Sequence, residues 1–91
     1  MNYRLLIDYA VIEFLETLPR RDQQLLRNRF VSLRDWPQKF SDYREPDFTG
    51  RSLDIHVCGK YAIKFWEDHT DRHVKILDVH FADGHDQKKL K

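Results

Sequence analysis

Residues 50–81 decide the fold, and they read GRSLDIHVC (50–58), GK (59–60), YAIKFW (61–66), EDHTDR (67–72) and HVKILDVHF (73–81). Three runs rich in β-branched and aromatic residues are separated here by two short polar turns. Such runs are typical of β-strands, and connections this short join strands that pair antiparallel. We therefore predict three consecutive antiparallel strands in this part of the chain.

Alternate residues of a strand point to opposite faces of the sheet, so the runs also predict which side chains share a face. One face receives apolar residues, namely Leu53, Ile55, Val57, Tyr61, Ile63 and Phe65. The other face receives Asp54, His56, Lys64 and His80. A sheet with an apolar back and a front of basic and imidazole groups is a suitable platform for a phosphate-rich ligand.

A strand and two helices are predicted before this region. The apolar run at residues 3–7 is short enough for a strand, and Asp8 can cap a following helix through its carboxylate. Residues of one helical face follow at i, i+3, i+4 and i+7 spacing, namely Val11, Phe14, Leu15 and Leu18. Pro19 ends this helix, since proline lacks an amide donor and restricts the residue before it.

The second helix is predicted over residues 20–36, with Leu26, Phe30 and Leu33 as its buried stripe and Pro37 as its end. The two helices have almost no linker, so they fold back as an antiparallel hairpin that covers the apolar sheet face. Residues 37–50 are expected to be an ordered connection anchored by three aromatic residues, Phe40, Tyr43 and Phe48.

Length and composition indicate one domain, with 91 residues, 41% hydrophobic residues and a net charge of only +1. We expect this domain at residues 1–82 and a frayed, charged tail at 83–91. Cys58 is the only cysteine, which excludes an intrachain disulfide and a thiolate metal cage. No run is apolar enough for a secretory signal or a membrane span, so we expect a cytoplasmic protein without a membrane partner.

The β-α-α-β-β-β order resembles the RelE/ParE superfamily of bacterial toxins over residues 2–82. The matching runs are residues 3–7, 14–19, 33–37, 48–50, 59–65 and 74–80. The resemblance implies an α+β fold in which a two-helix hairpin packs on a mostly antiparallel four-stranded sheet. It also implies an antitoxin partner and one of two activities: ribosome-dependent cleavage of messenger RNA, or inhibition of DNA gyrase.

The residue types on the polar face fit RNA cleavage without a metal or cofactor. Such cleavage needs a proton acceptor for the ribose 2′-hydroxyl and a cation for the phosphate. We assign proton transfer to His56 or His80, and phosphate or RNA contact to Lys64 and Arg51. The chain departs from RelE-like RNases at Ala62, where the family typically has arginine after tyrosine, and Lys64 is the nearest substitute.

Residues outside the polar sheet face receive other assignments. Arginines at positions 20, 27 and 34 are seven residues apart, so Arg20, Arg27 and Arg34 share one side of the second helix and could bind the antitoxin. His69 and His73 flank a turn and are expected to be exposed, and Cys58 is expected to be inert. Two alternatives to the RNase stay open: a gyrase inhibitor, which the missing arginine favours, and a non-catalytic interaction module that retains the fold.

Overall fold

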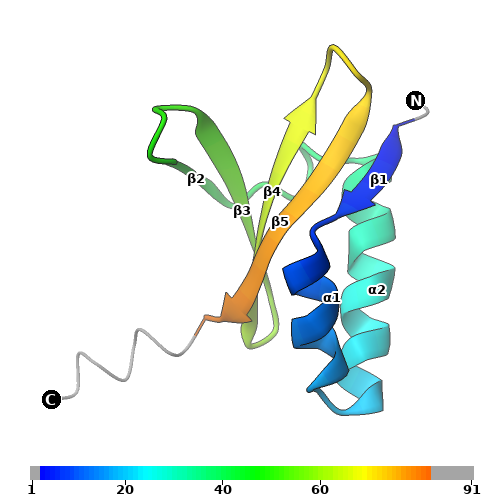
Figure 1. Ribbon diagram of the computed structural model, residues 1–91. Helices are drawn as coiled ribbons and strands as arrows, with labels where there is room; N and C mark the ends of the chain where they lie inside the picture. Colours follow the sequence, from blue (N-terminus) through cyan, green and yellow to red (C-terminus); the bar gives the residue numbers. More distant parts are fainter. Residues whose placement is uncertain (1–2, 83–91) are drawn as a thin grey trace, which may run out of the picture.

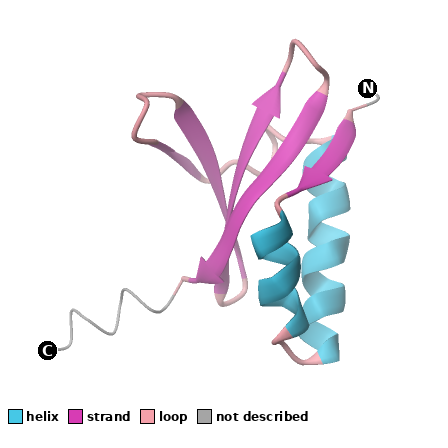
Figure 2. Ribbon diagram, in the orientation of Figure 1, coloured by secondary structure: helices cyan, strands magenta, loops and turns pink. Residues whose placement is uncertain are grey.

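The computed structural model describes residues 3–82 as two helices packed on one face of a twisted sheet (Figures 1 and 2). The elements in chain order are β1 (Arg4–Ile7), α1 (Tyr9–Glu16), α2 (Arg20–Asp35), β2 (Tyr43–Pro46), β3 (Ser52–Cys58), β4 (Tyr61–Asp68) and β5 (His73–Phe81). The predicted tail at 83–91 lies outside the described residues. No helix between residues 3 and 82 is long and apolar enough to cross a lipid bilayer.

The sheet has five strands in the order β1-β5-β4-β3-β2. β1 runs parallel to β5, and the other three pairs are antiparallel. The α+β class and the mostly antiparallel sheet are confirmed, but the prediction of four strands is wrong. The additional strand is β2, in the segment predicted to be a connection. It is a short edge strand, which can hold Pro46 at its end because an edge strand leaves some amides unpaired.

The helix boundaries follow the predicted signals. Asp8 caps α1, with the Ala10 amide donating to its carboxylate at 3.1 Å. Pro19 separates α1 from α2, and α2 ends at Asp35, just before Trp36 and Pro37. The two helices lie side by side and are joined at one end, as the predicted hairpin requires (Figure 1).

The hydrophobic core lies between the helices and the sheet. Val11 and Leu15 of α1 and the predicted stripe of α2 are buried against strand residues, namely Cys58, Tyr61, Ile63, Phe65, Val74, Ile76 and Val79. Burying each large apolar side chain contributes about 1.5–3 kcal/mol. Phe40 packs against this core, whereas Phe48 is fully exposed and Tyr43 is 51% exposed, so the predicted aromatic anchor is correct only for Phe40.

The predicted faces of β3 are wrong by one residue. Ile55 lies directly opposite Lys64, and His56 lies directly opposite the core residue Ile63. Directly opposite residues share a face, so Leu53, Ile55 and Val57 lie on the side away from the helices. Asp54 and His56 therefore face the helices. This is possible because Asp54 accepts hydrogen bonds from Ser41 and Arg44 at 2.6 and 3.0 Å, which satisfy a carboxylate that is almost fully buried.

Candidate functional site

The candidate site is the sheet face that the helices leave uncovered, which we call the open face. Cross-strand pairing assigns it Tyr43, Glu45, Leu53, Ile55, Val57, Ala62, Lys64, Trp66, Lys75, Asp78 and His80. Leu53, Ile55 and Ala62 are buried there, so the open face has a small apolar layer of its own beneath its polar side chains.

His80 is held in one orientation by Asp78, which precedes it by two residues on the same strand. The two side chains are joined between Nδ1 and Oδ2 at 2.8 Å, and each is about half exposed. A carboxylate on Nδ1 fixes the imidazole tautomer in which Nε2 is the proton acceptor. His80 thus has the arrangement of a general base with an orienting aspartate.

Lys64 lies next to this pair. It is directly opposite Asp78 on the neighbouring strand, and its Nζ is 3.0 Å from Oε2 of Glu45. The predicted grouping of Lys64 with His80 on an uncovered face is therefore confirmed. Arg51 enters the same face beside Trp66, with its guanidinium carbon 4.2 Å from the centre of the indole ring.

Each of the three cations on this face is paired with a carboxylate. Arg51 contacts Asp47 at 3.1 Å, Lys64 contacts Glu45, and Lys75 lies 3.4 Å from Asp68. The pKa of Asp47 is lowered, chiefly because it accepts a hydrogen bond from the Thr49 hydroxyl. A phosphate ligand must compete with these carboxylates for the cations, so the face is less attractive to nucleic acid than its number of cations suggests.

His56 does not belong to this site, and its predicted location on the polar front is wrong. The ring is buried beneath the helices, with Nδ1 3.0 Å from Asp42 and Nε2 3.2 Å from the guanidinium of Arg29 on α2. Arginine can only donate, so Nε2 accepts, and Nδ1 carries the proton that it donates to Asp42. Phe40 packs edge-on against the ring. His56 therefore ties α2 and the connection after it to β3.

Cys58 and Tyr61 lie on the helix side and are also buried. Burial raises the pKa of the Cys58 thiol, which agrees with the expectation that it is inert. Burial, assisted by the hydrogen bond that its hydroxyl donates to Asp22, raises the pKa of Tyr61 to about 12.

Comparison with solved structures reveals this architecture in RelE chains. The archaeal RelE–RelB complex from Pyrococcus horikoshii matches with a TM-score of 0.76 and 21% identity, over 92% of this chain and 99% of that one. The chain has the RelE fold. The E. coli RelBE toxin–antitoxin complex matches with a TM-score of 0.68 and 15% identity, over 89% and 98% of the two chains. The isolated E. coli RelE toxin matches with a TM-score of 0.67 and 14% identity, over 99% of this chain and 100% of that one. Neither a protein-family model nor a curated relative matches the sequence.

Ala62 lies on the open face near the start of β4, the middle strand of the sheet. It is directly opposite both Val57 on β3 and His80 on β5, so the three residues form one row across the sheet. The resemblance places an arginine here in RelE-like RNases. A longer side chain at position 62 would extend over the row beside His80, and Lys64 is the cation nearest to it along β4.

The helices of the RelE fold carry a second surface feature. A groove of about 350 Å³ runs between β1, α1 and α2, and it is lined by Leu5, Ile7, Ile12, Leu15, Arg27, Phe30 and Val31. Arg27 also lines a neighbouring polar hollow together with Arg20. Arg34 is instead paired with Asp35 at 3.0 Å. Of the three predicted partner-binding arginines, Arg27 thus borders the apolar groove and Arg20 borders the polar hollow beside it.

Sequence reasoning missed Asp78, Trp66 and Lys75 as parts of the open face. Asp78 had a usable signal, since a residue two positions before His80 on a strand must share its face. The contacts of Trp66 with Arg51 and Lys75 had no such signal in the sequence, because they depend on the strand register between β3, β4 and β5.

Proposed function

We propose that the protein is the toxin of a toxin–antitoxin module and inhibits translation by ribosome-dependent cleavage of messenger RNA in the cytoplasm. The observation that carries this proposal is the His80–Asp78 pair beside Lys64 on the open face of a RelE fold. The proposal requires no metal or cofactor, because the face provides both a proton acceptor and cations.

In the proposed reaction, His80 accepts the proton of a ribose 2′-hydroxyl through Nε2. The 2′-oxygen attacks the adjacent phosphorus, the bond from phosphorus to the 5′-oxygen breaks, and water protonates the leaving oxygen. Lys64 and Arg51 stabilise the negative charge that develops on the phosphate. Each leaves its carboxylate partner, Glu45 or Asp47, as the phosphate binds. Positioning of a base in this way contributes about 10²–10⁴-fold to a rate.

The proposed partner is a cognate antitoxin that binds the groove between β1, α1 and α2. An amphipathic segment would place apolar side chains against Ile12 and Val31, which are 39% and 41% exposed. Carboxylates on the same segment would face Arg20 and Arg27. Support for such a partner comes from the two RelE structures that contain RelB.

The second candidate function is inhibition of DNA gyrase by binding. Two features favour it: alanine stands at position 62 in place of arginine, and the cations of the open face are all paired with carboxylates. A non-catalytic interaction module is the third possibility, and it predicts neither activity.

Two parallel assays separate these functions. Primer extension on translating ribosomes should reveal new messenger RNA ends with the wild type and few with Lys64→Ala, whereas the exposed Lys39→Ala serves as the matched control and cleaves normally. A supercoiling assay should show unimpaired gyrase. Intact messenger RNA together with accumulated gyrase–DNA complexes would support the second function. Inactivity in both assays would contradict both and leave the interaction module.

A further inference from the structure

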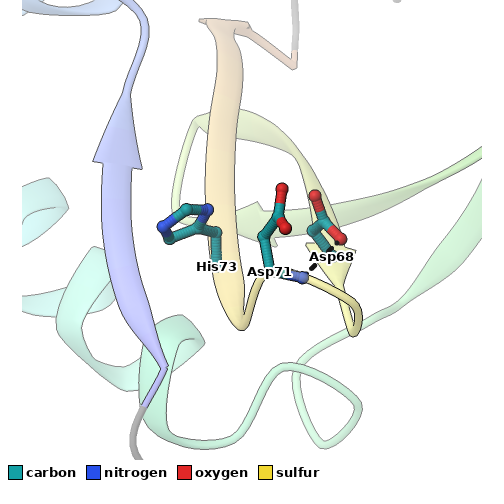
Figure 3. Close-up of side chains that lie close together, drawn as sticks. All are labelled: Asp68, Asp71 and His73. Carbon is teal, nitrogen blue, oxygen red and sulfur yellow. Dashed lines mark hydrogen bonds between the residues drawn. The ribbon is translucent and has the colours of Figure 1, made fainter.

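A cluster of three side chains at the tip of the β4–β5 hairpin lies apart from the residues proposed for cleavage. Asp68 ends β4 and His73 begins β5 directly opposite it, while Asp71 belongs to the turn between them. Each residue offers one ligand atom, and the three atoms lie within 4.8 Å of one another. Figure 3 shows the Asp71 carboxylate between Asp68 and the imidazole of His73.

The hairpin tip holds these residues in place. The Asp71 amide donates to Asp68 at 3.2 Å, and Arg72 adopts a left-handed conformation with φ of 58°. The amide of Arg4 in turn donates to the Arg72 carbonyl at 2.9 Å, so β1 supports the turn from the other side. The three ligand-bearing residues therefore lie in the turn and at the strand ends beside it, and β1 supports this turn through the Arg4 amide.

His73 provides separate evidence for a ligand at this cluster. It was expected to be exposed, but it is half-buried, and its Nδ1 is fully buried without a hydrogen-bond partner among the described residues. Buried polar atoms nearly always have partners, and an exception calls for a ligand, an ion or water. One ring nitrogen of His73 is turned toward the Asp71 carboxylate in Figure 3.

The donor set determines which ion fits. Two carboxylate oxygens and one imidazole nitrogen suit Zn²⁺ and related divalent transition metals, whereas Mg²⁺ and Ca²⁺ prefer oxygen ligands alone. Bonds of about 2.0–2.2 Å require the ligand atoms to move closer together, which rotation of the exposed Asp71 side chain allows. Lys75 competes with the ion for Asp68, since its Nζ lies 3.4 Å from Oδ2 of that carboxylate. The same ammonium lies 4.9 Å from the centre of the Trp66 ring, which offers it another partner when the ion binds.

We infer that Asp68, Asp71 and His73 form a binding site for a divalent transition metal such as Zn²⁺. The bound ion gives His73 Nδ1 a partner and ties β4 to β5 at their turn. It also displaces Lys75 from Asp68, which adds a free cation to the open face. Metal binding at this site does not require the proposed RNA cleavage, so either proposal can fail without the other.

Calorimetric titration of the metal-free full-length protein with ZnCl₂, alongside MgCl₂, tests the site. We expect one Zn²⁺ per chain, little affinity for Mg²⁺, and a Tm about 10–20 °C higher when free Zn²⁺ is at a hundred times Kd. Asp71→Asn, at an exposed position where misfolding is not expected, and His73→Gln should each weaken binding at least about tenfold. His69→Ala at the same turn is the control and should bind normally. Absence of Zn²⁺ binding, equal binding of Mg²⁺, or unchanged binding in both variants would overturn the inference.

Discussion

His56 and His80 lie on opposite faces of the sheet, and each is bound through Nδ1 to an aspartate. The His56 side chain is 8% exposed and lies 3.0 Å from Asp42, while His80 is 52% exposed and lies 2.8 Å from Asp78. The difference is at the other nitrogen, because Arg29 occupies Nε2 of the buried ring. The same pair of residue types is thus structural where both nitrogens are bonded inside the protein. It is suited to chemistry where one ring edge reaches solvent.

Replacement of the exposed histidine should have the largest effect. His80→Ala is expected to lower the rate of ribosome-dependent messenger RNA cleavage by about 10²–10⁴-fold, because the proton acceptor is lost. Its free energy of unfolding should change by no more than about 0.5 kcal/mol, since the side chain is half exposed. Primer extension and urea unfolding measure the two quantities. A variant that cleaves at the wild-type rate would remove His80 from the mechanism.

Replacement of the buried histidine should have the opposite signature. His56→Ala is expected to lower the free energy of unfolding by about 1–3 kcal/mol, because Arg29 and Asp42 lose a shared partner. The folded fraction should cleave at nearly the wild-type rate. Urea unfolding gives the first value, and activity corrected for the folded fraction gives the second. A stable but inactive His56→Ala protein would contradict the distinction between the two histidines.

Adding an arginine to the open face beside His80 should increase the cleavage rate. Ala62→Arg places a guanidinium in the row of Val57 and His80, where it can contact a phosphate through two N–H donors. We expect cleavage about tenfold faster than the wild type, equivalent to about 1.4 kcal/mol of transition-state stabilisation. Cleavage rates at saturating ribosome concentration test this, with Ala62→Gln as the uncharged control. An equal gain with glutamine would show that charge is not responsible.

The smallest effect concerns a buried group on the helix side. Because the pKa of Tyr61 is raised to about 12 from its ordinary value near 10, the protonated phenol stabilises the native state. This contribution is complete below about pH 10 and is lost as the pH rises through about 12. Tyr61→Phe should cost about 1 kcal/mol at neutral pH, and its deficit should shrink between pH 10 and 12. Urea midpoints across that range measure it, and a constant deficit would contradict the assignment.

The sequence was sufficient for the elements whose local signals agree with their packing. Asp8, Pro19 and Pro37 mark helix boundaries that the structure retains, and the stripe of α2 is its buried face. The polar turns at 59–60 and 69–72 likewise gave the order of β3, β4 and β5. These features depend on local chain chemistry, which a single sequence carries.

The sequence was not sufficient to predict which residues of β3 face the helices, because both faces of this strand bury side chains. Leu53 and Ile55 are buried on the open face, while Asp54 and His56 are buried toward the helices with polar partners. Alternation alone then assigns the apolar residues to the core, and a shift of one residue exchanges the faces. The partners of Asp54 and His56 come from residues 29–44, and no local pattern in the sequence indicates them.

Selective blocking of one face tests the central claim that the open face performs the reaction. Val57→Cys introduces a thiol in the row of Ala62 and His80, and Leu25→Cys introduces one on α2; the two native side chains are 41% and 40% exposed. Native Cys58 is buried and should remain unmodified. After labelling with a bulky maleimide, we predict that the protein labelled at position 57 loses messenger RNA cleavage on ribosomes and the one labelled at position 25 retains it. Full activity with position 57 blocked would contradict the account.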